Sequence, residues 1–268
     1  MQLKAILHPT DFTAASEVAF AHALKLALAA RAKLYIVHAE PSPPETIDWD
    51  AFPGVRRMLA RWGLMEPDSP PAAVGEQLGI AIRKLDVFGP DPARGILHFM
   101  ERHPADLIVL AAHGREGARR WFHRPVAEPL ARQAHLPALF LPHGGSGFVD
   151  PASGAVRLER VLAPVDHTPR PDAALAMAEH IATVLGVAEP QLRRLYVGAA
   201  GDAPAGVEPI IRQGPVVDAI VDAAQDLAAD LIVMATQGHQ GFLDALRGST
   251  TEQVLRRATR AVLAVPAA

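Results

Sequence analysis

The chain has 268 residues, 50% of them are hydrophobic, and its formal net charge is −3. A chain of this length folds as one large domain or as two domains of about 130 residues, and both are open at this point. The slightly acidic balance argues against nucleic acid as a partner, because nucleic-acid-binding domains are usually basic. The chain contains no cysteine, which excludes a disulfide framework and a thiol nucleophile.

No targeting or membrane-spanning segment is recognisable. The stretch MQLKAILHPTDF reaches Pro9 and Asp11 too soon to hold the apolar core of a signal peptide. No apolar run approaches the roughly 20 residues that span a bilayer. We therefore expect a soluble cytoplasmic protein that has no membrane partner.

The same segments occur twice, in the same order. The repeated pairs are AILHPTD (5–11) with VLAPVD (161–166), PADLIVLAAHG (104–114) with AADLIVMATQG (228–238), and LPALFLP (136–142) with RAVLAVP (260–266). The last two pairs share an offset of 124 residues. An internal repeat of this kind favours two homologous domains over one continuous domain.

The domain boundaries follow from what lies between the copies. The stretch HGGSGFVDPASG is rich in Gly, Ser and Pro, which is typical of a linker. We predict a first domain over 1–143, a linker over 144–155 and a second domain over 156–268. The first copy also carries an insertion, at about 41–80, that the second lacks. The insertion is proline-rich at both ends, its middle predicts a short amphipathic helix, and we interpret it as a lid or packing arm over the mouth of the first domain.

Strand-like and helical patterns alternate within each copy. The segment AASEVAFAHALKLALAARA spaces its larger apolar residues at helical intervals. The runs DLIVLAA and DLIVMAT have no polar alternation, which fits strands buried on both faces of a parallel sheet. Strands that alternate with helices imply right-handed βαβ units. The sequence therefore predicts an α/β protein with a doubly wound sheet in each domain.

The order of these motifs resembles the universal stress protein family in its tandem two-domain form. The resemblance rests on HPTDFTAASEVAFAHALKLA, ADLIVMATQG and the final AVLAVP. It implies Rossmann-like domains, each with a five-stranded parallel sheet of order 3-2-1-4-5. It also implies that the two copies pair through their last strands as a pseudo-dimer within one chain. Further association of two chains into a homodimer is open.

The family's nucleotide signature is Gly, two residues, Gly, nine residues, then Gly followed by Ser or Thr. In the second copy Gly238 and Gly248 are separated by nine residues and Ser249 follows, but Ala235 stands in place of the first glycine. Ligands of open α/β sheets bind beyond the carboxyl ends of the strands, where the strand order reverses. With the implied order, that point brings Asp166 beside the segment that begins at Ala235.

The segment GSTTE then opens the last helix, and helix N-termini attract anions. Gly248 removes a side chain where a phosphate would approach the backbone. We predict ATP or another adenine nucleotide, with accompanying Mg, in the second domain. The predicted binding residues are Pro164, Val165, Asp166, Val197, Met234, Ala235, Gly238, Gly248, Ser249, Thr250 and Thr251.

A second interpretation needs no ligand. Ser249 followed three residues later by Glu252 is a capping box, which starts a helix by itself. The methyl group of Ala235 also stands where a ribose or adenine would pass closely.

The first copy departs from the signature. Gly114 stands in place of Gly238, but Arg124 and Pro125 replace the Gly–Ser pair. Proline has no N–H to offer a phosphate, although it suits the first turn of a helix. We therefore predict that the first site does not bind a nucleotide.

Three histidines of the first copy, His8, His38 and His113, fall at or near the ends of predicted strands. Converging imidazoles could bind zinc. Histidine is common at the second and fourth of these strand ends in the family, so we favour a site without metal.

No catalytic motif is present: the chain lacks a Gly-x-Ser-x-Gly elbow, a Walker A lysine and a Gly-x-Gly-x-x-Gly fingerprint. The leading hypothesis is a non-catalytic stress or signalling protein that binds an adenine nucleotide and acts on an unknown protein partner. A ligand-free dimerising scaffold, with both sites decayed, and a slow ATP hydrolase are the alternatives.

Overall fold

The computed structural model describes residues 2–40, 49, 54–112, 127–142, 144–145, 147–204, 209–236 and 249–267. The strands are β1 (Ala5–Thr10), β2 (Lys33–Glu40), β3 (Ile82–Phe88), β4 (Leu107–Ala112), β5 (Ala138–Pro142), β6 (Arg160–Pro164), β7 (Gln191–Val197), β8 (Ile210–Arg212), β9 (Leu231–Thr236) and β10 (Ala261–Pro266). The α-helices are α1 (Ala14–Ala30), α2 (Val55–Arg61), α3 (Ala73–Leu78), α4 (Pro92–Arg102), α5 (Ala127–Ala134), α6 (Asp172–Val184), α7 (Val216–Asp226) and α8 (Thr250–Leu255).

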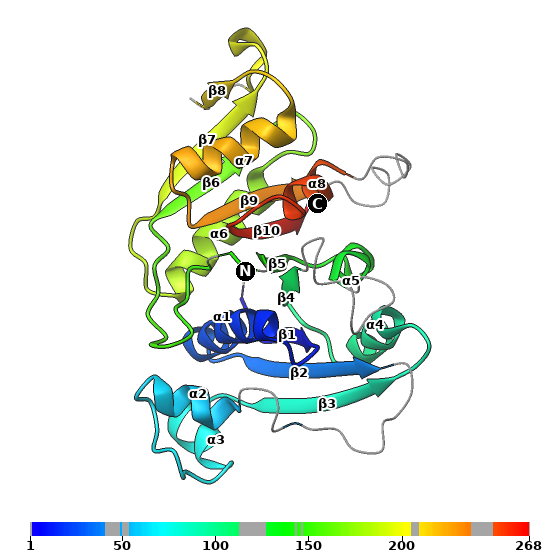
Figure 1. Ribbon diagram of the computed structural model, residues 1–268, viewed down its shortest axis with the longest axis vertical. Coiled ribbons are helices and arrows are strands. Elements are labelled where there is room, and N and C mark those ends of the chain that lie inside the picture. The colour runs from blue at the N-terminus through cyan, green and yellow to red at the C-terminus, as the bar shows by residue number, and fades with distance from the viewer. Residues whose placement is uncertain are drawn as a thin grey trace.

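All of these strands belong to one sheet, in which the two copies lie end to end (Figure 1). The strand order is β3-β2-β1-β4-β5-β10-β9-β6-β7-β8, so the second half mirrors the first. Neighbouring strands within each half are parallel. The halves meet through β5 and β10, which pair antiparallel. The predicted α/β class, with a doubly wound arrangement in each half, is confirmed.

Helices cover both faces of the sheet. One continuous apolar core contains buried residues of α1 and α6 together with strand residues from both halves. On the opposite face, one core lies under α4 and α5 and another under α7 and α8. The central strands are therefore buried on both sides, which explains why their sequences are apolar without alternation.

A repeated aspartate ties the first strand of each half to its fourth strand. Asp106, just before β4, accepts hydrogen bonds from the backbone N–H groups of Lys4 and Ala5 at 2.7 and 2.9 Å. Asp230, just before β9, holds the start of β6 in the same way, at 2.8 and 2.9 Å. Hydrogen bonds to a carboxylate are stronger than those between neutral groups. The aspartate that both repeats keep at this place, Asp106 and Asp230, is thus part of the scaffold.

The linker between the halves is held by a buried histidine of α1. The Nδ1–H group of His22 donates to the carbonyl of Val18 at 2.8 Å. Its Nε2 atom accepts from the backbone N–H groups of Phe148 and Val149, at 2.9 and 3.0 Å. Both ring nitrogens are therefore used by the neutral imidazole, and the linker is fixed against α1.

The insertion packs partly against the same linker. The indole N–H of Trp62, at the end of α2, donates to the Pro151 carbonyl at 3.1 Å. A Cβ atom on Gly154 would lie 2.6 Å from the Trp62 ring. The helices α2 and α3 lie toward the amino-terminal ends of β2 and β3, away from the mouth of the first domain (Figure 1). They form a packing arm, and in the described part of the insertion only Trp49 lies near that mouth.

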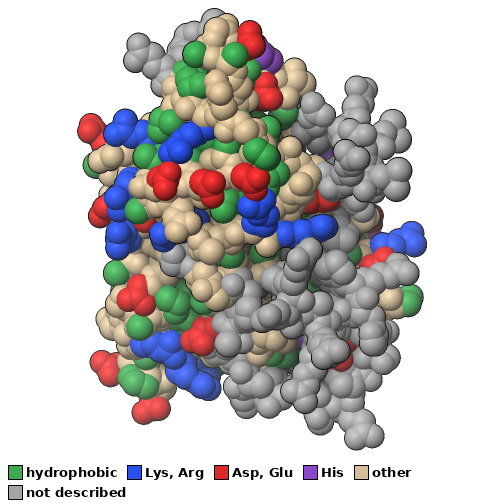
Figure 2. Space-filling view, turned by 45° about the horizontal axis from the view of Figure 1, so that its top comes forward, with side chains coloured by type: hydrophobic (Ala, Val, Ile, Leu, Met, Phe, Trp, Pro, Cys, Tyr) green, Lys and Arg blue, Asp and Glu red, His purple; other side chains and the backbone are tan. Residues whose placement is uncertain are grey.

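The surface carries charges of both signs. Acidic and basic side chains lie interspersed on the face seen in Figure 2, without a continuous basic patch. Exposed pairs include Arg212 with Asp226 at 2.8 Å and Arg61 with Glu17 at 3.1 Å. None of the helices in the described ranges is long and apolar enough to cross a membrane.

Two buried histidines make stability depend on pH. Burial lowers the pKa of both His8 and His22 from 6.5 to about 4, opposed by their hydrogen bonds to Val109 and Val18. As the pH falls below 6.5, these histidines become protonated in the unfolded chain, but in the folded chain they stay neutral until about pH 4. Acidification across this range therefore favours the unfolded state. We expect each histidine to remove about 3 kcal/mol of unfolding free energy across this window, on the scale of ~1.4 kcal/mol per pKa unit.

Urea unfolding across this pH window measures the effect, and His22→Leu isolates one contribution. The variant should be less stable at neutral pH, because two linker N–H groups lose their acceptor, at about 1–3 kcal/mol each. Its stability should also fall less steeply with acidification than that of the parent. Equal slopes for parent and variant would contradict the assignment.

Candidate ligand site

The second half of the sheet has a crevice where its strand order reverses. β6 lies between β7 and β9, and all three strands are parallel, so their carboxyl ends share one edge. The helices that follow β6 and β9 lie on opposite faces, which leaves space at this edge. The segments that follow these strand ends are the ones that the nucleotide prediction names.

A cavity of about 1200 Å³ occupies this position. Nine of the eleven predicted residues line it, and they come from the ends of three strands and from the start of α8. They are Pro164, Val165, Asp166, Val197, Met234, Ala235, Ser249, Thr250 and Thr251. The other two, Gly238 and Gly248, lie outside the described residues.

The start of α8 contains the predicted capping box. The Ser249 hydroxyl accepts from the Glu252 N–H at 3.2 Å, and the Ser249 N–H donates to the Glu252 carboxylate at 3.3 Å. These bonds use the hydroxyl oxygen only as an acceptor, and a serine hydroxyl also carries one proton to donate. Ser249 and Thr250 are exposed toward the cavity, whereas Thr251 is buried. The Ser249 hydroxyl can thus cap the helix and still donate to a ligand, whereas the Ser249 N–H is engaged with Glu252.

The aspartates that end the first strand of each half have different surroundings. Asp11 is buried, and its Oδ1 atom accepts from the Thr13 N–H at 3.1 Å and from the hydroxyls of Thr13 and Ser16 at 2.7 and 2.6 Å. Asp166 is exposed, and its Oδ1 atom accepts from the His167 N–H at 2.7 Å. Asp11 is engaged in starting α1, whereas Asp166 faces the cavity.

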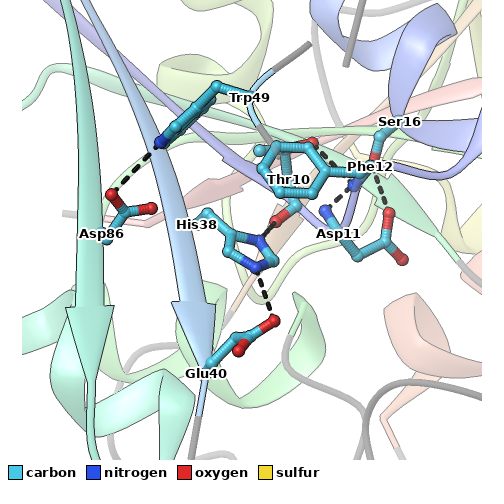
Figure 3. A network of polar contacts seen from close by, with 8 residues as sticks. All are labelled: Thr10, Asp11, Phe12, Ser16, His38, Glu40, Trp49 and Asp86. Carbon is cyan, nitrogen blue, oxygen red and sulfur yellow. Dashed lines mark hydrogen bonds and ion pairs between the residues drawn. The ribbon is translucent and has the colours of Figure 1, made fainter. Parts of the chain in front are cut away.

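A buried histidine–carboxylate pair lies at the corresponding edge of the first half (Figure 3). The His38 Nδ1–H group donates to the Thr10 carbonyl at 2.9 Å, and Nε2 lies 2.9 Å from the Glu40 carboxylate. Each ring nitrogen faces an oxygen atom, so both nitrogens are engaged in hydrogen bonds. The side chains of His38 and Glu40 are only 1% and 11% exposed, which makes this an enclosed ion-pair-like contact.

Aromatic side chains pack over that pair. The Phe12 ring stacks on the His38 ring with centroids 4.2 Å apart, and the Trp49 ring meets Phe12 edge-on at 5.2 Å (Figure 3). The Trp49 indole N–H donates to Asp86 at 3.2 Å. The described part of the first mouth is therefore closed by its own side chains.

The histidine trio predicted as a zinc alternative is only partly described. His8 lies within β1, is buried, and its Nδ1 atom bonds the Val109 carbonyl at 2.9 Å. The two ring nitrogens of His38 are engaged as above, and His113 lies outside the described residues. Within the described ranges, no three His, Asp or Glu side chains are grouped to hold a metal ion.

The structure adds lining residues that sequence reasoning missed. Thr168, Tyr196 and Thr236 line the cavity beside the predicted residues, and they were recognisable only by their position at strand ends. The first half contributes as well, with Leu97, Met100, Glu101, His135 and Leu136 among its members. No signal within one repeat could have predicted these contributions, because they depend on how the two halves meet.

The sequence profile of the universal stress protein family matches residues 2–142 and 165–266. The chain belongs to the universal stress protein family. Two separate matches in one chain confirm the tandem form. A universal stress protein of Methanocaldococcus jannaschii is 30% identical to it over 141 residues, which are 51% of this chain and 80% of that protein.

Solved structures of similar extent show the same fold. A universal stress protein from Archaeoglobus fulgidus aligns with a TM-score of 0.64 at 20% identity, covering 99% of this chain and 97% of that one. A functionally unknown protein from Pseudomonas aeruginosa aligns with a TM-score of 0.62 at 16% identity, covering 99% and 93%. At these identities the likeness concerns the universal stress protein fold alone.

The zinc alternative can be tested directly. We expect purified protein to contain no stoichiometric zinc by elemental analysis, because His38 already uses both ring nitrogens and His8 uses Nδ1 inside the sheet. One zinc ion per chain that disappears in the His8→Ala variant would contradict this expectation.

Proposed function

We propose that this universal stress protein binds an adenine nucleotide in its second domain and acts through the bound state rather than as an enzyme. The observation that carries the proposal is the convergence of nine predicted residues on one cavity at the reversal of strand order. The nucleotide is ATP or a smaller adenylate, with Mg accompanying its phosphates. The occupied and empty states would then differ in their contacts with an unknown protein partner.

The chemistry of the lining suits such a ligand. Val165 and Met234 are buried and offer apolar walls to a base. Asp166 can accept hydrogen bonds from ribose hydroxyls or from the adenine amino group. The Ser249 and Thr250 hydroxyls, at the start of α8, can donate to phosphate oxygens. Apolar walls with a few placed polar groups are typical of small-molecule sites.

Ala235 favours one alternative, a ligand-free dimerising scaffold. Its methyl group lies on the cavity wall in the place of the first signature glycine. The antiparallel pairing of β5 and β10 would also serve a scaffold without any ligand. A slow ATP hydrolase is a further hypothesis, which steady turnover above that of a binding-deficient variant would favour.

The two halves should differ in stoichiometry. Calorimetric titration with ATP and Mg is expected to give at most one site per chain, because Arg124 and Pro125 replace the Gly–Ser pair and Asp11 is engaged locally. Two equivalent sites per chain would contradict the prediction.

Transferring the first copy's residues to the second should abolish binding. In the double variant Gly248→Arg, Ser249→Pro, the hydroxyl is lost together with the Ser249 N–H, which donates to Glu252 in the structure and in our proposal turns to the phosphate on binding. Hydrogen bonds to a charged group contribute about 1.5–3 kcal/mol each, so affinity should weaken roughly tenfold to a thousandfold. Folding should change little, because Ser249 has φ −66°, which proline adopts without strain, and the lost cap costs about 1 kcal/mol.

The matched control is Ser249→Ala, which loses the hydroxyl that caps the Glu252 N–H but keeps the backbone N–H of residue 249. Its melting temperature should fall by a similar or smaller amount than that of the double variant, while its nucleotide affinity falls less. If the double variant binds ATP as the parent does, the GSTTE segment serves only as a helix cap. If the parent itself does not bind, Ala235 has closed the site and the scaffold alternative stands.

A further inference from the structure

The cavity of the second domain continues into the first. Because β5 and β10 pair antiparallel, the amino-terminal edge of the first half lies beside the carboxyl-terminal edge of the second. The last turns of α4 and α5 are therefore brought next to the second-domain crevice. Met100 and Glu101 of α4 and His135, just after α5, line the same cavity as Asp166 and Ser249.

The part of the cavity that lies between the domains is largely apolar. Leu97 of α4, Leu136 after α5 and Leu255 of α8 line it, and all three are only half-buried. Leu255 packs against the cores of both halves. Phe140 and Met100 complete this wall, which we call the interdomain groove. Among the described residues, none fully covers the apolar surface that these leucines present to the cavity.

The cavity is also larger than a nucleotide requires. Its volume is about 1200 Å³. Sites for a single drug-sized ligand, the class to which a mononucleotide belongs, measure roughly 300–1,000 Å³. The polar residues of the predicted site stand at one end, at Asp166, Ser249 and Thr250. The remaining space is lined mainly by apolar side chains, with Glu101, Gln133 and His135 of the first domain as its polar members, and it is continuous with the polar site.

We infer that the ligand of this site is amphipathic, with a nucleotide-like head at the second-domain crevice and an apolar arm, such as an acyl chain, in the interdomain groove. The identity of the head rests on the proposed function. The evidence for the apolar arm is the interdomain groove alone. A small molecule fits better than a protein segment, because the groove is continuous with the polar site and belongs to the same cavity. The first domain, whose own mouth is covered in its described part by Phe12 and Trp49, thereby contributes to the site of the second.

A series of ligands with one head and different arms tests the inference. The probes are acetyl-, octanoyl- and dodecanoyl-sulfamoyl adenosine, with ATP as the head-only ligand and dodecanoate as the arm-only ligand. Calorimetry gives each dissociation constant. We expect affinity to rise about tenfold or more for every four methylenes that enter the groove. Equal affinity for the three acyl compounds would overturn the inference.

Two variants remove the groove by opposite means. Ala134→Trp fills it from the half-buried end of α5, and Leu97→Gln makes its wall polar. Both should abolish the dependence on chain length and leave the affinity for ATP within about twofold of the parent, a change of a few tenths of a kcal/mol. Leu175→Gln, at a half-buried leucine of α6 outside the cavity, is the matched control and should keep the dependence. Chain-length dependence that survives in both groove variants would overturn the inference.

Failure of the proposed function gives a different result. If neither ATP nor the acetyl compound binds, the nucleotide head is wrong. Binding of dodecanoate and of the dodecanoyl compound, lost in Ala134→Trp, would then still support the apolar arm. If the dodecanoyl compound does not bind either, both the proposed function and the arm are rejected.

Discussion

The antiparallel pairing of β5 with β10 is the contact on which the rest of the molecule depends. Its register sets Phe140 opposite Val262, Leu139 opposite Leu263 and Ala138 opposite Ala264. Each half by itself would leave one of these apolar strands as an unpaired sheet edge, which is a liability for a soluble domain. Pairing satisfies both edges and joins two sheets into one. It also reverses the strand direction at the junction, and this reversal brings the helix ends of one half beside the crevice of the other.

The two halves keep the scaffold of the universal stress protein fold while differing at their strand ends. Asp106 and Asp230 hold the same two strands together in each copy. Asp11 and Asp166 also correspond in sequence, yet the first is bound by Thr13 and Ser16, whereas the second is exposed to a cavity. Thr168 stands in the place of Thr13, so the sequence difference lies farther on, where Pro171 stands in the place of Ser16 and offers Asp166 no hydroxyl. Divergence has thus acted on the site and spared the hydrogen bonds that fix the sheet.

The insertion and the linker provide additional packing around the first half. His22 accepts two linker N–H groups, and Trp62 packs on the same linker where Gly154 leaves room for its ring. At the other end of the sheet, Phe12 and Trp49 cover the buried pair of His38 and Glu40. The described residues of the insertion therefore pack against the rest of the first domain and the linker. In our proposal, the first domain contributes to ligand binding through the last turns of α4 and α5.

The sequence by itself determined the repeat, the α/β class and the central strands, because apolar runs without alternation reflect burial on two faces, which is a local property. Apolar residues at helical spacing, another local pattern, predicted a helix within 14–32 and a short amphipathic helix within 50–63, where the structure has α1 and α2. It did not resolve the edge strands β3 and β8, whose residues are half-exposed and so lack a continuous apolar run. Nor did it predict the α3 helix, which lies in a proline-rich stretch that resembles a loop.

Only the tertiary structure decided which groups share a cavity. The strand-end residues of the second copy could be predicted to lie together, because parallel strands of one sheet end at one edge. The leucines of α4, α5 and α8 could not, since they belong to different copies and meet only through the antiparallel junction. The different surroundings of Asp11 and Asp166 were equally hidden. Hydrogen bonding and burial at a strand end depend on side chains from other segments. The sequence pattern of one segment therefore cannot predict them.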